Sequence, residues 1–201
     1  MRRFILACAG LLACCASATG APRAVAGENT VAAPSLVQVA REAAGLRANE
    51  QARRAAIAWL SRQVYSYQRA TWRWENLMGV PRTPTEGRVL AEMRVEHVKA
   101  AVHLWKRRAA VAHRKAQRPP HLQQFLCIHC YEGSWTDGGG PYYGGLQMDI
   151  GFQAAYGRGL LRAKGTADHW TPLEQIWVAE RAARSRGFYP WPNTARYCGL
   201  I

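Results

Sequence analysis

Acidic residues are scarce in this sequence of 201 residues, which has 13 Asp and Glu against 27 Lys and Arg and a formal net charge of +14. A site built on several carboxylates therefore has few candidates. The basic excess lies before residue 119, because residues 119–201 hold six acidic and seven basic groups. We expect the basic part to be drawn to an anionic partner and the nearly neutral part to carry the chemistry.

Long hydrophobic runs are also missing, and no stretch has the ~20 apolar residues that a membrane-spanning helix needs. Arg2 and Arg3 instead precede a short apolar run from Phe4 to about Ala18, and small residues follow. This pattern predicts a secretory signal peptide over residues 1–26. Lipoprotein processing at Cys14 is a less favoured alternative. We expect a secreted, cell-wall-associated protein, for which nucleic acid is not an expected partner.

Cysteine is rare too, and three of the six cysteines fall within the predicted signal peptide. Cys127, Cys130 and Cys198 remain, so an oxidising compartment predicts one disulfide and one odd thiol. The C-x2-C pair supplies too few ligands for a structural zinc site, and we expect neither a metal nor another cofactor. A bridge from one member of the pair to Cys198 would close ~70 residues and contribute on the order of 4 kcal/mol.

Helical periodicity dominates the basic part, after a flexible segment over residues 27–35. Two apolar seams with alternating spacings of three and four residues are separated by the proline- and glycine-rich residues 79–88. They predict a basic antiparallel helical hairpin over residues 36–118. Its charged outer face is either simply solvated or a surface for anionic wall polymers or a membrane. The seams are Ile57, Leu60, Val64, Tyr67, Thr71, Trp74 and Met78, and Ala91, Val95, Val98, Val102, Trp105, Ala109 and Ala112.

Two prolines at positions 119 and 120 mark the boundary to a second domain over residues 121–201. This domain is expected to begin with a helix over 123–131, followed by a glycine-rich loop or irregular hairpin over 134–143. A short helix is predicted over 146–156. Thr171, Pro172 and Glu174 have the pattern of a helix start, and that helix should end before Gly187.

Glu132 lies between a predicted apolar helix end and a loop rich in glycine and aromatic residues. A carboxylic acid between apolar walls can hold a proton near neutrality and donate it. Aromatic side chains at a loop-lined cleft suit the C–H faces of sugar rings. Glu132 is therefore a candidate general acid acting on a glycan, although an isolated glutamate is more often an ordinary surface residue.

Two long stretches, CIHCYEGSWTDGGGPYYGGLQMDIGFQAAYG and TPLEQIWVAERAARSRGFYPWPNTARYC, together resemble the catalytic domain of resuscitation-promoting factors. More broadly they resemble the transglycosylase-like branch of the lysozyme superfamily, over about residues 126–198. The resemblance implies a small lysozyme-like fold, mainly α (α+β) with an irregular β element. It also implies cleavage of the β-1,4 bond between N-acetylmuramic acid and N-acetylglucosamine in the glycan strands of peptidoglycan.

The resemblance places Glu132 on the family's catalytic glutamate. The implied substrate-binding residues are Trp135, Tyr142, Tyr143, Gly145, Gln147 and Trp191. The family usually has a cysteine directly before the glutamate, whereas Tyr131 stands there in this sequence. This departure leaves open which of Cys127 and Cys130 pairs with Cys198. Cys127, about one helical turn from Glu132, is favoured as the partner, and Cys130 as the odd thiol.

Two mechanisms and one non-catalytic function remain open. A lytic transglycosylase needs one acid/base, Glu132, because the substrate supplies the other groups. A muramidase-type hydrolase would need a second carboxylate, for which Asp137 is the candidate, since Asp149 is expected to cap a helix. The third possibility is a wall-binding or signalling module without activity. The scarcity of carboxylates favours the single-acid mechanism.

Overall fold

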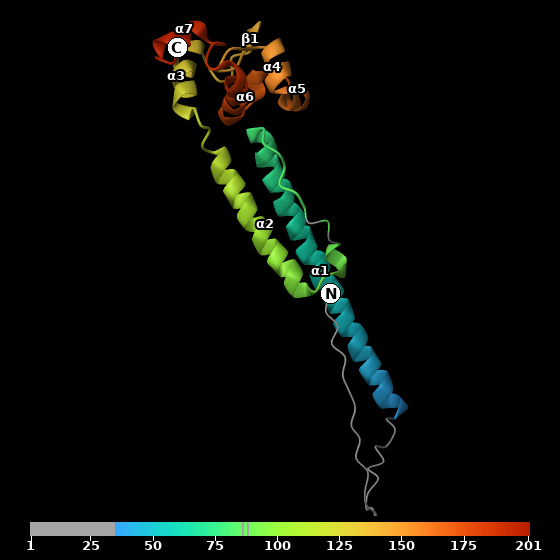
Figure 1. Cartoon of the computed structure of the whole chain (residues 1–201). Coiled ribbons are helices and arrows are strands. Elements are labelled where there is room, and N and C mark those ends of the chain that lie inside the picture. The colour runs from blue at the N-terminus through green and yellow to red at the C-terminus, as the bar shows by residue number, and fades with distance from the viewer. Residues whose placement is uncertain (1–34, 86, 88) are drawn as a thin grey trace, which may run out of the picture. The chain divides into compact units, whose positions relative to one another are not determined.

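The computed structural model describes residues 35–85, 87 and 89–201. It is mainly helical with one small two-stranded antiparallel sheet, which confirms the predicted fold class (Figure 1). The predicted signal peptide, the lipidation alternative at Cys14 and residues 27–34 lie outside the described residues. None of the helices in the described ranges combines the length and apolarity needed to cross a membrane.

Two long helices form the basic part: α1 covers Leu36–Met78 and α2 covers Val95–Ala116, with a short 3-10 turn, η1, at Leu90–Glu92. We call α1 and α2 the helix pair. Both predicted seams are largely buried, as their spacing requires. Their common core contains Ile57, Leu60 and Val64 from α1 and Val98, Val102 and Trp105 from α2.

The prediction of an antiparallel hairpin is wrong, because α2 runs in the same direction as α1. Trp72 packs edge-to-face on Trp105, Trp74 lies 4.8 Å from the ring of His113, and the last residues of the two helices, Met78 and Ala116, share one cluster. Successive contacts therefore advance along both helices together. In Figure 1 the chain follows α1, returns as an extended segment and then follows α2 in the original direction.

The connection between the helices explains this arrangement. Gly79 has a φ of 64°, which ends α1, and Pro81 and Pro84 disfavour a new helix until Val95. The connection of about 16 residues can span up to ~50 Å when extended, more than the ~33 Å length of α2. Thr83 fastens it to α1, since its backbone N–H donates to Glu75 and its carbonyl accepts from the Trp72 indole, both within 2.9 Å.

The C-terminal region, residues 121–201, is made of short elements, and two of its predicted helices are confirmed. Helix α3 matches the predicted helix at 123–131, and α6 ends before Gly187. The helix predicted over 146–156 begins only at Ile150, because Gly144–Gln147 form a turn between two strands, and Asp149 caps it by accepting from Phe152 N. The elements are α3 (Leu122–Glu132), β1 (Tyr142–Tyr143), β2 (Met148–Asp149), α4 (Ile150–Tyr156), α5 (Arg158–Lys164), η2 (Ala167–His169), α6 (Pro172–Arg186) and α7 (Pro192–Tyr197).

A hydrophobic core and one disulfide hold these elements together. The core gathers buried side chains from α3, the β1–β2 turn, α6 and α7. Cys127 on α3 is bonded to Cys198 just after α7, which confirms the favoured pairing. Cys130 is exposed and free, as predicted.

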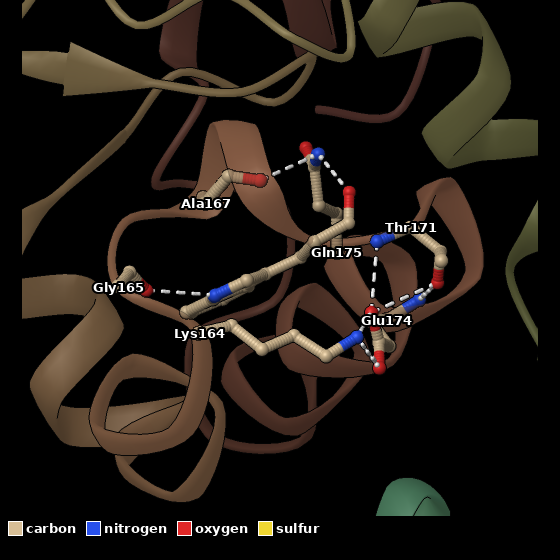
Figure 2. Close-up of polar contacts among 7 residues, drawn as sticks. Lys164, Gly165, Ala167, Thr171, Glu174 and Gln175 are labelled. Atoms are coloured by element: carbon tan, nitrogen blue, oxygen red, sulfur yellow. Dashed lines mark hydrogen bonds and ion pairs between the residues drawn. The ribbon is translucent and has the colours of Figure 1, made fainter.

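Helix α6 begins with a complete capping box, which confirms the predicted start (Figure 2). The Thr171 hydroxyl accepts from the Glu174 backbone N–H, and the Glu174 carboxylate accepts from the Thr171 backbone N–H at 2.8 Å. Lys164 adds an ion pair to Glu174 at 2.7 Å. The start of α6 is thus fixed both to its own first turn and to the end of α5.

Residues 43–201 form one compact unit, in which α6 contacts the C-terminal ends of both long helices. The Arg181 Nη1 donates to the Leu77 carbonyl at 2.6 Å, and an Arg184 Nη2 donates to the Met78 carbonyl at 2.8 Å. The Trp177 indole donates to the Ala116 carbonyl at 2.8 Å. These groups satisfy carbonyls that a helix leaves unpaired in its last turn, and the arginine charges complement the helix dipole.

Candidate active site

Glu132 is the last residue of α3 and is half-buried. The helix ends there because Gly133 has a φ of 144°, a conformation that favours glycine. The Thr194 hydroxyl on α7 donates to Glu132 Oε1 at 2.7 Å. Glu132 Oε2 has no hydrogen-bond partner among the described residues. The disulfide between Cys127 and Cys198 joins these same two helices, so the carboxyl is held at a fixed place with one oxygen free.

Asp137 lies near Gly133, the residue that follows Glu132, and is engaged in holding its own loop. Its Oδ2 accepts from Gln147 Nε2 at 2.9 Å, its Oδ1 from the Gly139 backbone at 3.1 Å, and its carbonyl from Gly144 N at 2.7 Å. A Cβ placed on Gly133 would lie 3.4 Å from both Asp137 Oδ2 and Gln147 Nε2. The Asp137–Gln147 pair is therefore directly next to the residue that follows Glu132.

The Gly144–Gln147 turn is tightly packed, which explains its glycines. A Cβ on Gly145 would lie 2.5 Å from His129 Nδ1 and 2.7 Å from the Trp135 ring, so no larger residue fits without a shift. Gln147 has a φ of 47°, a left-handed conformation that is uncommon for a residue other than glycine. Gly145 thus has a packing role, and the backbone at Gln147 is strained in favour of its contact with Asp137.

The aromatic residues predicted to bind substrate divide into exposed and packed groups. Tyr142 is 51% exposed on β1, whereas Tyr143 is half-buried and packs against the core. Trp135 is half-buried and has one face covered by the His129 ring, with the ring centroids 3.8 Å apart. Trp191 is only 4% exposed, and its indole donates to the Leu146 carbonyl at 2.7 Å. The main contribution of Trp191 is therefore to the core.

A cavity of about 360 Å³ lies next to these residues. Tyr142, Gln147 and Trp191 line it together with Arg186, while Glu132 is not among its lining residues. Gln147 lies near both places, because it contacts Asp137 close to Gly133 and also forms part of the cavity wall. A sugar ring in this cavity would be close to Tyr142 and Gln147.

Gln175 is a site residue to which the sequence argument gave no role. It is 0% exposed on α6, and its Oε1 accepts from Gly145 N at 2.9 Å. Its Nε2 lies 2.8 Å from the carbonyls of Trp135 and Ala167, and Figure 2 shows the contact with Ala167. One buried amide thus holds the loop after Glu132, the glycine turn and the start of α6. In the sequence, the only indication of this role is that Gln175 is a polar residue next to the apolar face of a predicted helix.

Thr194, the partner of Glu132, was also missed, and a single threonine in a short helix offers no signal in the sequence. Comparison of the chain with protein-family models, with curated proteins and with solved structures finds no match. The assignment of a function therefore depends on the residues and their geometry.

Proposed function

We propose that this protein is a secreted enzyme that cleaves the β-1,4 bond between N-acetylmuramic acid and N-acetylglucosamine in peptidoglycan, with Glu132 as general acid and base. The observation that carries the proposal is the environment of Glu132: a carboxyl fixed by Thr194 through one oxygen, with the other oxygen free, beside a loop with aromatic residues. The sequence resemblance and the disulfide support it.

The two carboxyl oxygens of Glu132 have different roles in the proposed reaction. Because the Thr194 hydroxyl donates to Oε1, the proton of the acid form is best placed on Oε2. Oε2 gives this proton to the glycosidic oxygen as the bond to the muramic-acid C1 breaks. The substrate's own N-acetyl group stabilises the positive charge that develops at C1. The 6-hydroxyl of the same sugar then attacks C1, and Glu132 takes its proton, which yields a 1,6-anhydro product.

The hydrolase alternative requires Asp137 as a second carboxylate. Both oxygens of Asp137 already accept hydrogen bonds, from Gln147 and from the Gly139 backbone, and its carbonyl holds the glycine turn. These contacts favour a positioning role for Asp137 and therefore the single-acid mechanism. Product analysis separates the two, because a transglycosylase yields anhydro-sugar ends and a hydrolase yields reducing ends.

The test is digestion of purified peptidoglycan by the full chain and by Glu132→Gln. Loss of general acid catalysis should lower the rate of bond cleavage by ~100-fold or more. Glu96→Gln is the matched control, because Glu96 is exposed on α2, where it forms an ion pair with Lys99. Lysis by Glu132→Gln at the unmodified rate would overturn the role of Glu132. A folded but inactive parent protein would favour the non-catalytic wall-binding or signalling module.

A further inference from the structure

A second cavity, of about 1090 Å³, lies between the end of α1 and helices α4 to α6, away from Glu132. Its volume lies just above the ~300–1,000 Å³ typical of small-molecule sites. Five arginines line it, and Glu174 is the one carboxylate among its lining residues, already engaged by Lys164 and by Thr171. The cavity is thus strongly cationic. The arginines are Arg69, Arg73, Arg82, Arg158 and Arg181.

Two of these arginines lie over tryptophan rings that also line the cavity. The Arg73 guanidinium carbon is 4.8 Å from the ring centroid of Trp74, and that of Arg82 is 5.8 Å from Trp72. A guanidinium placed over a ring contacts it with its face, so N–H groups along its edge remain able to bind an oxyanion. The cavity wall therefore has aromatic rings next to guanidinium groups that can donate hydrogen bonds.

Arg181 is a partly buried cation in the wall of the cavity. Its guanidinium donates to the carbonyls of Tyr156 and Leu77, and no carboxylate pairs with it within the described part of the chain. Burial, followed by the charge of Arg184, lowers the pKa of Arg181 to about 10. An anion entering the cavity would relieve this unfavourable positive charge.

We propose that this cavity binds a small saccharide that carries an oxyanion, either a phosphate or a carboxylate. The arginine edges suit the oxyanion, because guanidinium groups match both phosphate and carboxylate. The tryptophans and the apolar residues Leu77 and Leu160 suit the faces of a sugar ring. This site is separate from Glu132, and the proposal does not depend on the catalytic activity.

Isothermal titration calorimetry with the full chain tests the proposal. The probes are glucose 6-phosphate, glucuronate, neutral glucose and inorganic phosphate. At least one of the two anionic sugars should bind ~10-fold or more tightly than glucose and than phosphate alone, and the tighter one identifies the preferred oxyanion. Equal binding of all four probes, or phosphate binding as tightly as the sugar phosphate, would contradict the proposal.

Variants locate the site. Arg73→Gln combined with Arg158→Gln should weaken binding of the anionic sugar by ~10-fold or more, since two charged donors are lost. Both residues are exposed, so the fold should persist, as circular dichroism can check. Arg47→Gln combined with Arg62→Gln is the control, because it removes two exposed arginines of α1 that lie outside the cavity. An equal effect of both changes would show general charge attraction and overturn the site. Peptidoglycan cleavage should not change in the double variant.

Discussion

The helix pair and the C-terminal region are stabilised by different kinds of contact. The pair depends on one apolar seam, and its ion pairs lie on the surface, where hydrogen bonds from Arg53 and Arg54 lower the pKa of Glu50 to about 2. The C-terminal region adds to its core a disulfide and the buried amide of Gln175. A seam fixes the register of two helices, whereas buried polar contacts fix loops.

This difference suits the proposed activity. The loop after Glu132 and the glycine turn have little regular structure of their own, and their positions depend on contacts made by Gln175, Asp137 and Thr194. Acid catalysis needs groups held in place, and buried hydrogen bonds provide this. The helix pair has no such requirement and instead presents its positive charge to solvent.

The disulfide gives the largest expected difference between the two regions. Cys198→Ala should lower the free energy of unfolding of the C-terminal region by about 4 kcal/mol, because a closed loop of ~70 residues is opened in the unfolded chain. The helix pair should lose less of its helical structure than the C-terminal region does. Thermal unfolding followed by near-ultraviolet and far-ultraviolet circular dichroism measures the two effects. Cys130→Ala is the control, since this thiol is free and exposed; equal effects of the two changes would contradict the prediction.

Gln175→Leu should have the next largest effect and lower the free energy of unfolding by about 2–3 kcal/mol. The change leaves Gly145 N and the carbonyls of Trp135 and Ala167 buried without their partner. Chemical denaturation measures the loss, and peptidoglycan cleavage should fall with it at temperatures where the variant is still folded. Gln123→Leu, an exposed position on α3, provides the comparison. Stability unaffected by Gln175→Leu would show that the loops are held by other contacts.

Arg184→Gln tests the contact between α6 and the end of α1, and it should lower the free energy of unfolding by about 1 kcal/mol. The arginine donates to the Met78 carbonyl and complements the dipole of α1. Amide hydrogen exchange should become faster in the last turn of α1 and remain unchanged near Leu60. Arg186→Gln removes a nearby charge that makes no such contact, so faster exchange in both variants would count against a specific role for Arg184.

The smallest effect concerns pH and the start of α6. Burial by itself would raise the pKa of Glu174, but hydrogen bonds from Lys164 and Thr171 outweigh it and lower the pKa. The stabilisation is therefore present above the unfolded pKa of about 4.3 and is lost as pH falls through the lower folded value.

Glu174→Gln should thus cost about 1 kcal/mol or less at pH 7, after allowance for solvent screening, and progressively less toward pH 3. Urea unfolding at several pH values measures this trend. Glu92→Gln, at an exposed position before α2, is measured alongside as the comparison. A cost that grows as the pH falls would have the wrong sign for a lowered pKa.

Regular elements were predictable from the sequence where a repeating pattern or a local signal existed. The apolar seams, the Thr171 cap and the glycine stop at position 187 all act within a few residues of their signal. The direction of α2 was not predictable in this way. It depends on whether residues 79–94 turn sharply or run back along α1, and that is decided by the bonds of Thr83 to Glu75 and Trp72.

The candidate site shows the same limit. Glu132, the disulfide and the glycine turn could be named from the sequence because the resemblance gives each of them a role. Thr194 and Gln175 could not be given roles, since their partners lie about 30 to 60 residues away along the chain. Trp191 was expected at a binding surface, but a tryptophan has the same sequence signal whether its ring faces a ligand or the core.

The parallel course of α1 and α2 has a consequence for how the chain folds. In an antiparallel hairpin the contacts nearest the turn form first, and each later contact closes only a small additional loop. Here Trp72 with Trp105, Trp74 with His113 and Met78 with Ala116 all close loops of about 30 to 40 residues, so none of these three contacts between the helices is local. Pairing of the two helices therefore requires long-range encounters, and its rate should be slower than the helical content of the pair implies.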